Sequence, residues 1–248
     1  MSDLGGLFES CPALRRSEER ARNNLDDRKW ILDLIPKESV GAELGVFTGL
    51  LSEAILEIVR PRRLFLVDVW WTRYGEFYPD WGAYTDFGRL PTRVAYEAAV
   101  FRTNSSTSEV TRVVSSSIDW ACSIPDASLD WAYIDTTHSY AQTVDELKAL
   151  APKVKPNGLI LGDDWRADPE HPHHGVMLAV NDFVRQTNFD IGAAGQATQW
   201  LITRREARFD RANSIFDHDR AKSWRSRLRL DRFLQGSKRL TGQPKAVG

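Results

Sequence analysis

Short apolar runs alternate with longer amphipathic stretches along most of this chain. The runs are rich in aliphatic and β-branched residues and are bounded by Gly, Pro or Asp, as buried strands are. They predict strands at 39–44, 64–69, 110–114, 128–135, 159–162, 190–194 and 199–203. The stretches between them predict helices at 48–59, 94–104, 139–150 and 176–187. This alternation predicts an α/β fold with a mostly parallel seven-stranded sheet and helices on both faces.

Both ends of the chain depart from this central pattern. Residues 11–34 are rich in Arg and Glu, with apolar residues at helical spacing, so we expect an N-terminal helix that packs ahead of the sheet. We therefore divide the chain into an N-terminal helical segment (1–35), a central domain (36–206) and a C-terminal extension (207–248).

The charge is unevenly distributed. The whole chain of 248 residues has 42% hydrophobic and 27% charged residues and a net charge of -1, which predicts a globular protein without a general attraction to nucleic acid. Residues 204–248, however, hold 13 Lys and Arg against 5 Asp and Glu. Their apolar residues, from Ile215 to Leu234, predict a broken helix. This basic tail would dock on its own domain or a second subunit, or bind an acidic partner or membrane surface.

The cysteines and the N-terminus indicate the compartment. Cys11 and Cys122 lie far apart and form neither a disulfide framework nor a metal-ligand spacing. The N-terminus lacks a basic segment leading into an apolar one, and no stretch approaches the roughly 18 apolar residues of a membrane span. We expect a cytoplasmic protein with reduced thiols.

A glycine-rich segment follows the first predicted strand. It runs Gly41-Ala-Glu-Leu-Gly-Val-Phe-Thr-Gly49, and Asp68 ends the next strand. Glycines between a strand and a helix let a ligand approach the backbone, and a carboxylate at the end of the next strand can bind a ribose diol. The pattern predicts a site for a nucleoside cofactor.

Acidic residues also end other predicted strands. Those at the carboxyl ends of strands are Glu43, Asp68, Asp135, Asp163 and Asp164. In an open α/β sheet, ligands bind at this edge, close to the point where the strand order reverses. A single acid there is often a turn former or helix cap, but five acids along one edge indicate a functional site.

These motifs carry a family resemblance. Glu43, Gly45 and Gly49, followed by Asp68, resemble the first motifs of class I S-adenosylmethionine (SAM) methyltransferases. Residues 129–140, and the segments 152–158 and 160–165, are similar to the macrocin-type sugar O-methyltransferases and related small-molecule methyltransferases. The resemblance covers about residues 30–205. It implies a Rossmann-like class I methyltransferase domain at 36–206 that transfers a methyl group from SAM.

The glycine spacing also separates SAM from a dinucleotide. A dehydrogenase fingerprint would read Gly-x-Gly-x-x-Gly, whereas the glycines here are four residues apart and enclose Glu43. An acid there would repel a diphosphate but suits the cationic sulfonium and amino groups of SAM. The resemblance implies SAM contacts at Glu43, Gly45, Thr48, Gly49, Asp68, Ser116, Ser117 and Asp135. Ser116 stands where many relatives have an acid, and this serine run is also typical of a helix N-cap before Ile118.

The second half of the site concerns the acceptor. Asp135, Asp163 and Asp164 end neighbouring predicted strands, and three converging carboxylates repel one another unless a cation neutralises them. In the sugar O-methyltransferases that this chain resembles, the corresponding acids bind Mg²⁺, a hard cation that prefers oxygen ligands. Mg²⁺ would orient two vicinal hydroxyls of the acceptor and lower their pKa.

The family places an acid, a candidate general base, where this chain has Thr137. We expect His138 to be the base, with Asp135 and Asp164 as the other catalytic residues; His138 could instead hold a loop, and Asp164 could be the base of a metal-free site. His171, His173 and His174 have no zinc-site spacing and predict a loop that faces the acceptor.

An aromatic insert, residues 70–88, follows the second predicted strand. It has eight aromatic residues in nineteen, which predicts packing on the core or a dimer partner, or a lid over the acceptor. Arg73 and Arg89 could select an anionic acceptor. A homo-oligomer could form through this insert, the N-terminal helix or the basic tail.

The sequence therefore predicts a SAM-dependent O-methyltransferase acting on a small-molecule hydroxyl, of a sugar or glycosylated natural product, with Mg²⁺ activating the acceptor. One alternative is a metal-independent O- or N-methyltransferase. An alternative of another class is a SAM-binding protein that acts on nucleic acid through the basic tail, which the near-neutral overall charge disfavours.

Overall fold

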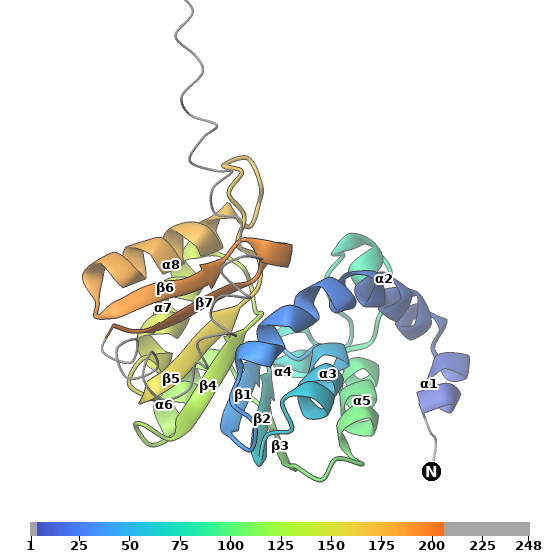
Figure 1. The fold of residues 1–248 in the computed structure, drawn as a ribbon. Helices are drawn as coiled ribbons and strands as arrows, with labels where there is room; N and C mark the ends of the chain where they lie inside the picture. Colours follow the sequence, from blue (N-terminus) through green and yellow to red (C-terminus); the bar gives the residue numbers. More distant parts are fainter. Residues whose placement is uncertain (1–3, 206–248) are drawn as a thin grey trace, which may run out of the picture. The chain divides into compact units, whose positions relative to one another are not determined.

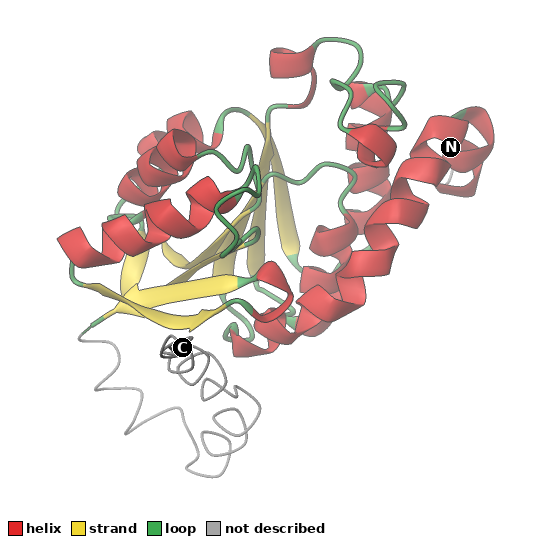
Figure 2. Cartoon of the chain, turned by 90° about the horizontal axis from the view of Figure 1, so that it is seen from above, coloured by secondary structure: helices red, strands yellow, loops and turns green. Residues whose placement is uncertain are grey.

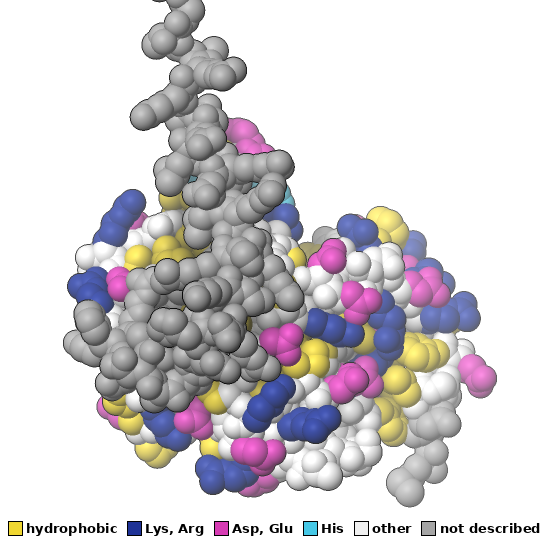
Figure 3. All heavy atoms as spheres, viewed as in Figure 1, with side chains coloured by type: hydrophobic (Ala, Val, Ile, Leu, Met, Phe, Trp, Pro, Cys, Tyr) yellow, Lys and Arg dark blue, Asp and Glu magenta, His cyan; other side chains and the backbone are white. Residues whose placement is uncertain are grey.

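The computed structural model describes residues 4–205, which belong to one compact unit of the chain. The predicted tail helix and the other interpretations of residues 207–248 lie outside the described residues. Within the described range, no helix is both long and apolar enough to cross a membrane. Figure 3 shows basic and acidic side chains interspersed on one face of the described part.

A single seven-stranded sheet forms the centre, in the order β3-β2-β1-β4-β5-β7-β6 (Figure 1). Pairing is parallel from β3 to β5, and β7 is antiparallel to both of its neighbours. The strands are β1 (Val40–Leu44), β2 (Arg63–Asp68), β3 (Glu109–Val114), β4 (Leu129–Ile134), β5 (Val154–Gly162), β6 (Phe189–Ala194) and β7 (Trp200–Arg204). All seven predicted strands are confirmed, and the order reverses between β1 and β4, whose carboxyl ends lie side by side.

Helices cover both faces of the sheet (Figure 2). One face packs on α2, α3 and α5 through residues such as Trp131 and Leu161, and the other packs on α6, α7 and α8 through residues such as Ala132 and Ile160. The helices of the domain are α3 (Leu50–Ile58), α5 (Thr92–Thr103), α6 (Ser117–Ser123), α7 (Tyr140–Leu150) and α8 (His174–Gln186). Burial on both faces explains why the strands read as continuous apolar runs.

The N-terminal segment is more divided than the single helix predicted at 11–34. It comprises α1 (Leu4–Ser10), α2 (Pro12–Arg28) and a 3₁₀ helix, η1 (Lys29–Leu34). A buried ion cluster anchors α2, because Arg102 of α5 pairs with Glu18 of α2 and lies 2.8 Å from Glu53 of α3. This anchoring brings the last residue of α2 to the carboxyl ends of β4 and β5.

The aromatic insert packs against α2 and the turn after β1. It carries α4 (Trp70–Tyr74) and the 3₁₀ helix η2 (Gly82–Thr85). Asp86 pairs with Arg16 of α2 at 2.7 Å, and the Tyr78 ring meets the ring of Phe47 edge to face at 5.1 Å. Phe77, Trp81 and Phe87 remain exposed. The insert thus packs on the core, which was one of the predicted arrangements, and three of its aromatic side chains stay exposed.

Candidate functional site

The turn after β1, residues 45–49, lies tightly against the rest of the fold. Gly45 has a φ of +88° and Gly49 a φ of +80°. A Cβ on Gly45 would stand 1.8 Å from the carbonyl oxygen of Asp135, and one on Gly49 would stand 2.8 Å from Cα of Ala99. Only glycine therefore fits at Gly45, and the bare backbone there forms a cradle at the end of β1.

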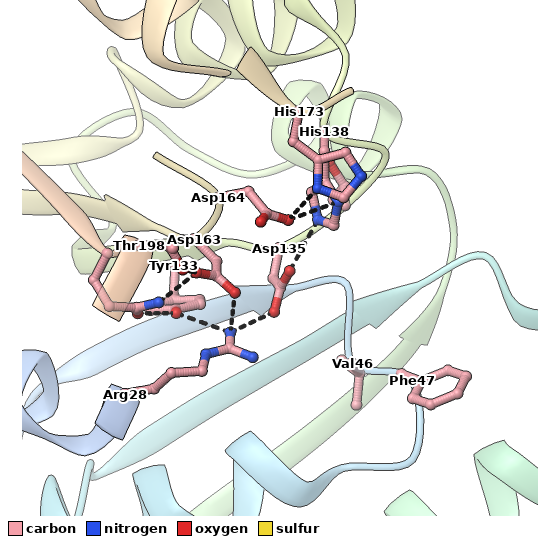
Figure 4. A network of polar contacts seen from close by, with 12 residues as sticks. Arg28, Val46, Phe47, Tyr133, Asp135, His138, Asp163, Asp164, His173 and Thr198 are labelled. Carbon is pink, nitrogen blue, oxygen red and sulfur yellow. Dashed lines mark hydrogen bonds and ion pairs between the residues drawn. The ribbon is translucent and has the colours of Figure 1, made fainter. Parts of the chain in front are cut away.

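Asp68 holds this turn in place. Its Oδ2 accepts hydrogen bonds from the amides of Val46 and Phe47 at 2.8 Å each, and its Oδ1 accepts one from the amide of Trp70 at 3.1 Å (Figure 4 labels Val46 and Phe47). Burial raises the pKa of Asp68, against the lowering effect of these amides. The residue predicted to bind a ribose thus also shapes the turn beneath it.

Two polar side chains are buried at this point, Glu43 of β1 and Thr48 of the turn. Glu43 is 1% exposed and accepts a hydrogen bond from Ser52, and burial raises its pKa to about 8. The Thr48 hydroxyl is buried and finds no hydrogen-bond partner among the described residues. An unpaired buried hydroxyl at a backbone cradle is what a polar cofactor would satisfy. The turn therefore fits SAM as the sequence predicted.

Glu43→Gln should change how stability depends on pH. The carboxyl keeps its proton up to about pH 8 when folded but loses it near pH 4.5 when unfolded, so the wild-type protein loses stability as the pH rises across this window. Glutamine does not titrate. We expect the melting temperature of the variant minus that of the wild type to grow from pH 5 to pH 8 and then level off. Thermal unfolding followed by circular dichroism measures this difference. Glu57→Gln, at an exposed position of α3, is the control, and parallel pH curves for Glu43→Gln and wild type would contradict the burial argument.

The serine run begins a helix. Ser116 caps α6, with its hydroxyl accepting from the amide of Asp119 at 3.1 Å, so the N-cap interpretation is confirmed. Ser117 is buried and donates to Glu146 at 2.5 Å. Their contact with the cofactor stays a prediction.

An arginine joins the acids at the ends of β4 and β5. Nη2 of Arg28 lies 2.5 Å from Oδ2 of Asp135 and 3.2 Å from Oδ2 of Asp163, and it donates to the Tyr133 hydroxyl at 3.1 Å (Figure 4). Asp163 is further held by the Thr198 hydroxyl at 2.6 Å. Burial raises the pKa of Asp163 to about 6. One guanidinium thus compensates two buried carboxylates.

This arrangement bears on the predicted Mg²⁺ site. Asp135, Asp163 and Asp164 do gather, with one oxygen of each within 4.8 Å of the others. Arg28, however, bonds the facing oxygens of Asp135 and Asp163, and the other oxygen of Asp163 accepts from Thr198 and Gln199. Mg²⁺ requires near-octahedral oxygen ligands at about 2.1 Å. Asp135, Asp163 and Asp164 as arranged do not fit Mg²⁺, because the guanidinium of Arg28 lies between two of the three carboxylates.

His138 lies between two carboxylates. Its Nε2 is 3.0 Å from Oδ1 of Asp135, and its Nδ1 is 2.9 Å from Oδ2 of Asp164. Burial disfavours the charged ring, but these two hydrogen bonds outweigh burial and raise the pKa of His138 to about 10. In this arrangement His138 already holds a proton at neutral pH and donates it to the aspartates. Its predicted role as the base stays a prediction that requires a change of partner.

The histidine-rich loop supplies one further residue to this cluster. Nδ1 of His173 lies 2.9 Å from Oδ2 of Asp164, the same oxygen that His138 approaches. His174 instead bonds the Arg166 carbonyl at 2.8 Å, and His171 accepts from the amide of His173 at 3.1 Å. Of the three histidines, only His173 is therefore shown contacting a predicted site residue.

Sequence reasoning missed Arg28, Tyr133 and Gln199. Arg28 sits in a helix full of Arg and Glu, where nothing distinguishes it from surface charge. Tyr133 and Gln199 are fully buried polar residues within or beside strands, and their hydroxyl and amide bond each other. A polar residue inside an apolar strand was the available signal.

A cavity lies at the opposite edge of the sheet, where the strands begin. Its volume is about 440 Å³, and it is lined by residues at the starts of strands, such as Val40, Arg63 and Glu109. Ligands of open α/β sheets bind at the carboxyl ends of the strands, so the glycine turn and acids mark the site better than this cavity does.

Comparisons with known proteins bear on the family and the fold. A family model described as a methyltransferase domain matches residues 40–165. No curated protein sequence matches the chain. A solved protein from Corynebacterium glutamicum has a TM-score of 0.53 at 15% identity, covering 81% of this chain and 95% of its own, which shows a shared fold. The O-methyltransferase NovP has a TM-score of 0.46 at 20% identity, covering 75% and 79%. A Streptococcus mutans protein in complex with SAH has a TM-score of 0.46 at 11% identity, covering 75% and 96%.

Proposed function

The chain belongs to the methyltransferase-domain family and is a SAM-dependent methyltransferase, and we propose that it methylates a hydroxyl group of a small molecule, a sugar or glycosylated natural product. One observation carries the proposal. The glycine turn with Asp68 and the polar cluster of Arg28, Asp135 and His138 lie at the same edge of the sheet, at neighbouring strand ends. A cofactor cradle beside a cluster of hydrogen-bonding groups suits methyl transfer to a polar acceptor.

SAM, when bound, supplies an electrophilic methyl group. The chain's own residues hold it: Gly45 and Gly49 give it backbone to lie against, and Asp68 offers carboxylate oxygen to the ribose. The unpaired Thr48 hydroxyl and the buried Glu43 carboxyl are available to the methionine part. The turn is already tied down by Asp68, so little ordering is needed on binding.

The acceptor half favours hydroxyl groups. Arg28 compensates the charge of Asp135 and Asp163. Each carboxylate oxygen can accept more than one hydrogen bond, so the oxygens that already face Arg28 and His138 can accept another from a polyol. The exposed rings of Trp81, Phe77 and Phe87 in the adjoining insert are faces on which a sugar can stack. The reaction would then depend chiefly on alignment of the hydroxyl with the methyl group.

The proposed reaction does not use the Mg²⁺ ion that the sequence predicted on Asp135, Asp163 and Asp164. With Arg28 between Asp135 and Asp163, the acceptor is held without Mg²⁺ on the three aspartates. The alternative without Mg²⁺ that the sequence left open is therefore the form we propose.

The function is tested by methyl transfer from isotope-labelled SAM to matched pairs of hydroxylated, deoxygenated and amine-bearing small molecules. We expect label on oxygen, only in acceptors that carry the hydroxyl, at rates unchanged when Mg²⁺ is omitted. Transfer to nitrogen alone would overturn the O-methyltransferase proposal, and loss of turnover on omission of Mg²⁺ would overturn its Mg²⁺-independent form. Binding of SAM is checked separately by calorimetry.

A further inference from the structure

Three potential metal ligands converge from separate elements at one point of the site. His138 lies in the loop after β4, Asp164 is the second residue after β5, and His173 immediately precedes α8. Nδ1 of each histidine lies 2.9 Å from the same oxygen, Oδ2 of Asp164 (Figure 4). The centroids of the two imidazole rings are 4.6 Å apart, and the ring planes are tilted by 54°.

These distances suit coordination of one ion. One atom from each residue lies within 4.8 Å of the others. Ligands bound at about 2.0–2.2 Å in a tetrahedron stand about 3.4 Å from one another, so the two separations of 2.9 Å would need to open by only about 0.5 Å. No large rearrangement is therefore needed to bring three ligand atoms around an ion.

The surroundings of the histidines point the same way. Nε2 of His138 is 3.0 Å from Oδ1 of Asp135, and a metal-binding histidine almost always donates its other ring N–H to such a carboxylate or carbonyl. Nδ1 of His173 is buried and has no hydrogen bond of good geometry within the described part of the chain. Asp135 thus orients the ring of His138, and His173 offers a ring nitrogen that has no hydrogen bond among the described residues.

We propose that His138, Asp164 and His173 bind a divalent transition metal, of which Zn²⁺ is the first candidate. Two imidazole nitrogens and one carboxylate oxygen are the donor set of catalytic Zn²⁺ and related ions, which keep open positions for water or substrate. Mg²⁺ prefers oxygen ligands and is disfavoured by this set. The site differs from the three-aspartate arrangement, because Arg28 bonds Asp135 and Asp163 and leaves Asp164 to the histidines.

Two positive charges oppose the ion. The proton on Nδ1 of His138 must leave when the ion binds, so binding should strengthen as the pH rises. Nε of Arg166 lies 3.3 Å from Oδ1 of Asp164, on the oxygen that the histidines do not approach. The carboxylate of Asp135 behind His138 offsets this positive charge. Oδ2 of Asp164 therefore remains the oxygen for the metal.

The test titrates the full-length protein with Zn²⁺ by calorimetry, and with Co²⁺ followed by its visible absorption. We expect wild-type protein to bind one Zn²⁺ with micromolar affinity or better. His173→Ala and Asp164→Asn should weaken binding by at least about 100-fold, because changing only a residue that hydrogen-bonds a ligand already costs about 10–100-fold. His173 is 38% exposed in a loop, so its variant should keep the wild-type melting temperature.

His174→Ala is the matched control, since it removes the neighbouring histidine, whose ring bonds the Arg166 carbonyl and not Asp164. Wild-type affinity in this control supports the proposal. An equal loss in His174→Ala and His173→Ala, unchanged binding in His173→Ala, or no Zn²⁺ binding by the wild type would overturn it. SAM titrations of the same variants keep this result distinct from the proposed function, because the metal site can fail while SAM still binds.

Discussion

Asp68→Ala is expected to weaken SAM binding by at least about 100-fold. The substitution removes the charged acceptor of three backbone amides, those of Val46, Phe47 and Trp70, and with it the predicted partner of the ribose. A hydrogen bond to a charged group contributes about 1.5–3 kcal/mol. The loss of the two hydrogen bonds expected from the ribose hydroxyls would therefore cost about 3 kcal/mol or more, and each 1.4 kcal/mol is about tenfold in affinity. Calorimetric titration with SAM measures the loss.

Asp68→Asn separates the two roles of this side chain. Its amide oxygen can still accept from the turn, so we expect this variant to keep the wild-type melting temperature more closely than Asp68→Ala while still losing affinity for SAM. Asp145→Ala, at an exposed position of α7, is the matched control and should bind SAM normally. Wild-type affinity in Asp68→Ala would show that the cofactor lies elsewhere.

Arg28→Met is expected to lower the free energy of unfolding by about 3–5 kcal/mol, the cost of removing one partner from a buried ion pair. Methionine retains a long apolar side chain but leaves the carboxylates of Asp135 and Asp163 without their cation. Urea unfolding at pH 7 measures the change. Arg22→Met is the matched control on the same helix, because Arg22 is 52% exposed and 3.7 Å from Glu18, and such surface pairs contribute at most about 1 kcal/mol.

The same variant tests whether the guanidinium takes the place of a metal. Without Arg28, the three aspartates are free to take up Mg²⁺, so Mg²⁺ should raise the melting temperature of Arg28→Met and leave that of the wild type unchanged. Stabilisation of the wild type by Mg²⁺ to the same extent would show that Arg28 does not exclude the ion.

Local sequence was sufficient to predict where the residues proposed to bind the cofactor lie. Gly45, Gly49 and Asp68 lie within one strand–turn–helix–strand unit, so their spacing in the chain fixes their spacing in the fold. The strands were equally predictable, because burial on both faces requires continuous apolar runs. The gathering of Asp135, Asp163 and Asp164 followed from the rule that parallel strands end at one edge.

The acceptor half depends on contacts between segments distant in the sequence. Arg28 reaches Asp135 across 107 residues, and no pattern in α2 indicates that its last arginine turns inward. The geometry of His138 and Asp164 also rests on left-handed backbone, with φ values of +57° and +61°, which residue types alone do not predict. This is why His173 could be named as a loop residue but not paired with its aspartate.

The cation at the centre of the site comes from a helix that lies outside the segment matched by the family model, residues 40–165. The acids of the matched domain and the charge that balances them thus lie in separate segments of the chain. Replacement of Arg28 would leave Asp135 and Asp163 without their cation, although residues 40–165, which match the family model, stayed the same. Sorting such enzymes by metal dependence therefore calls for inspection of the helix before the domain as well as of the domain itself.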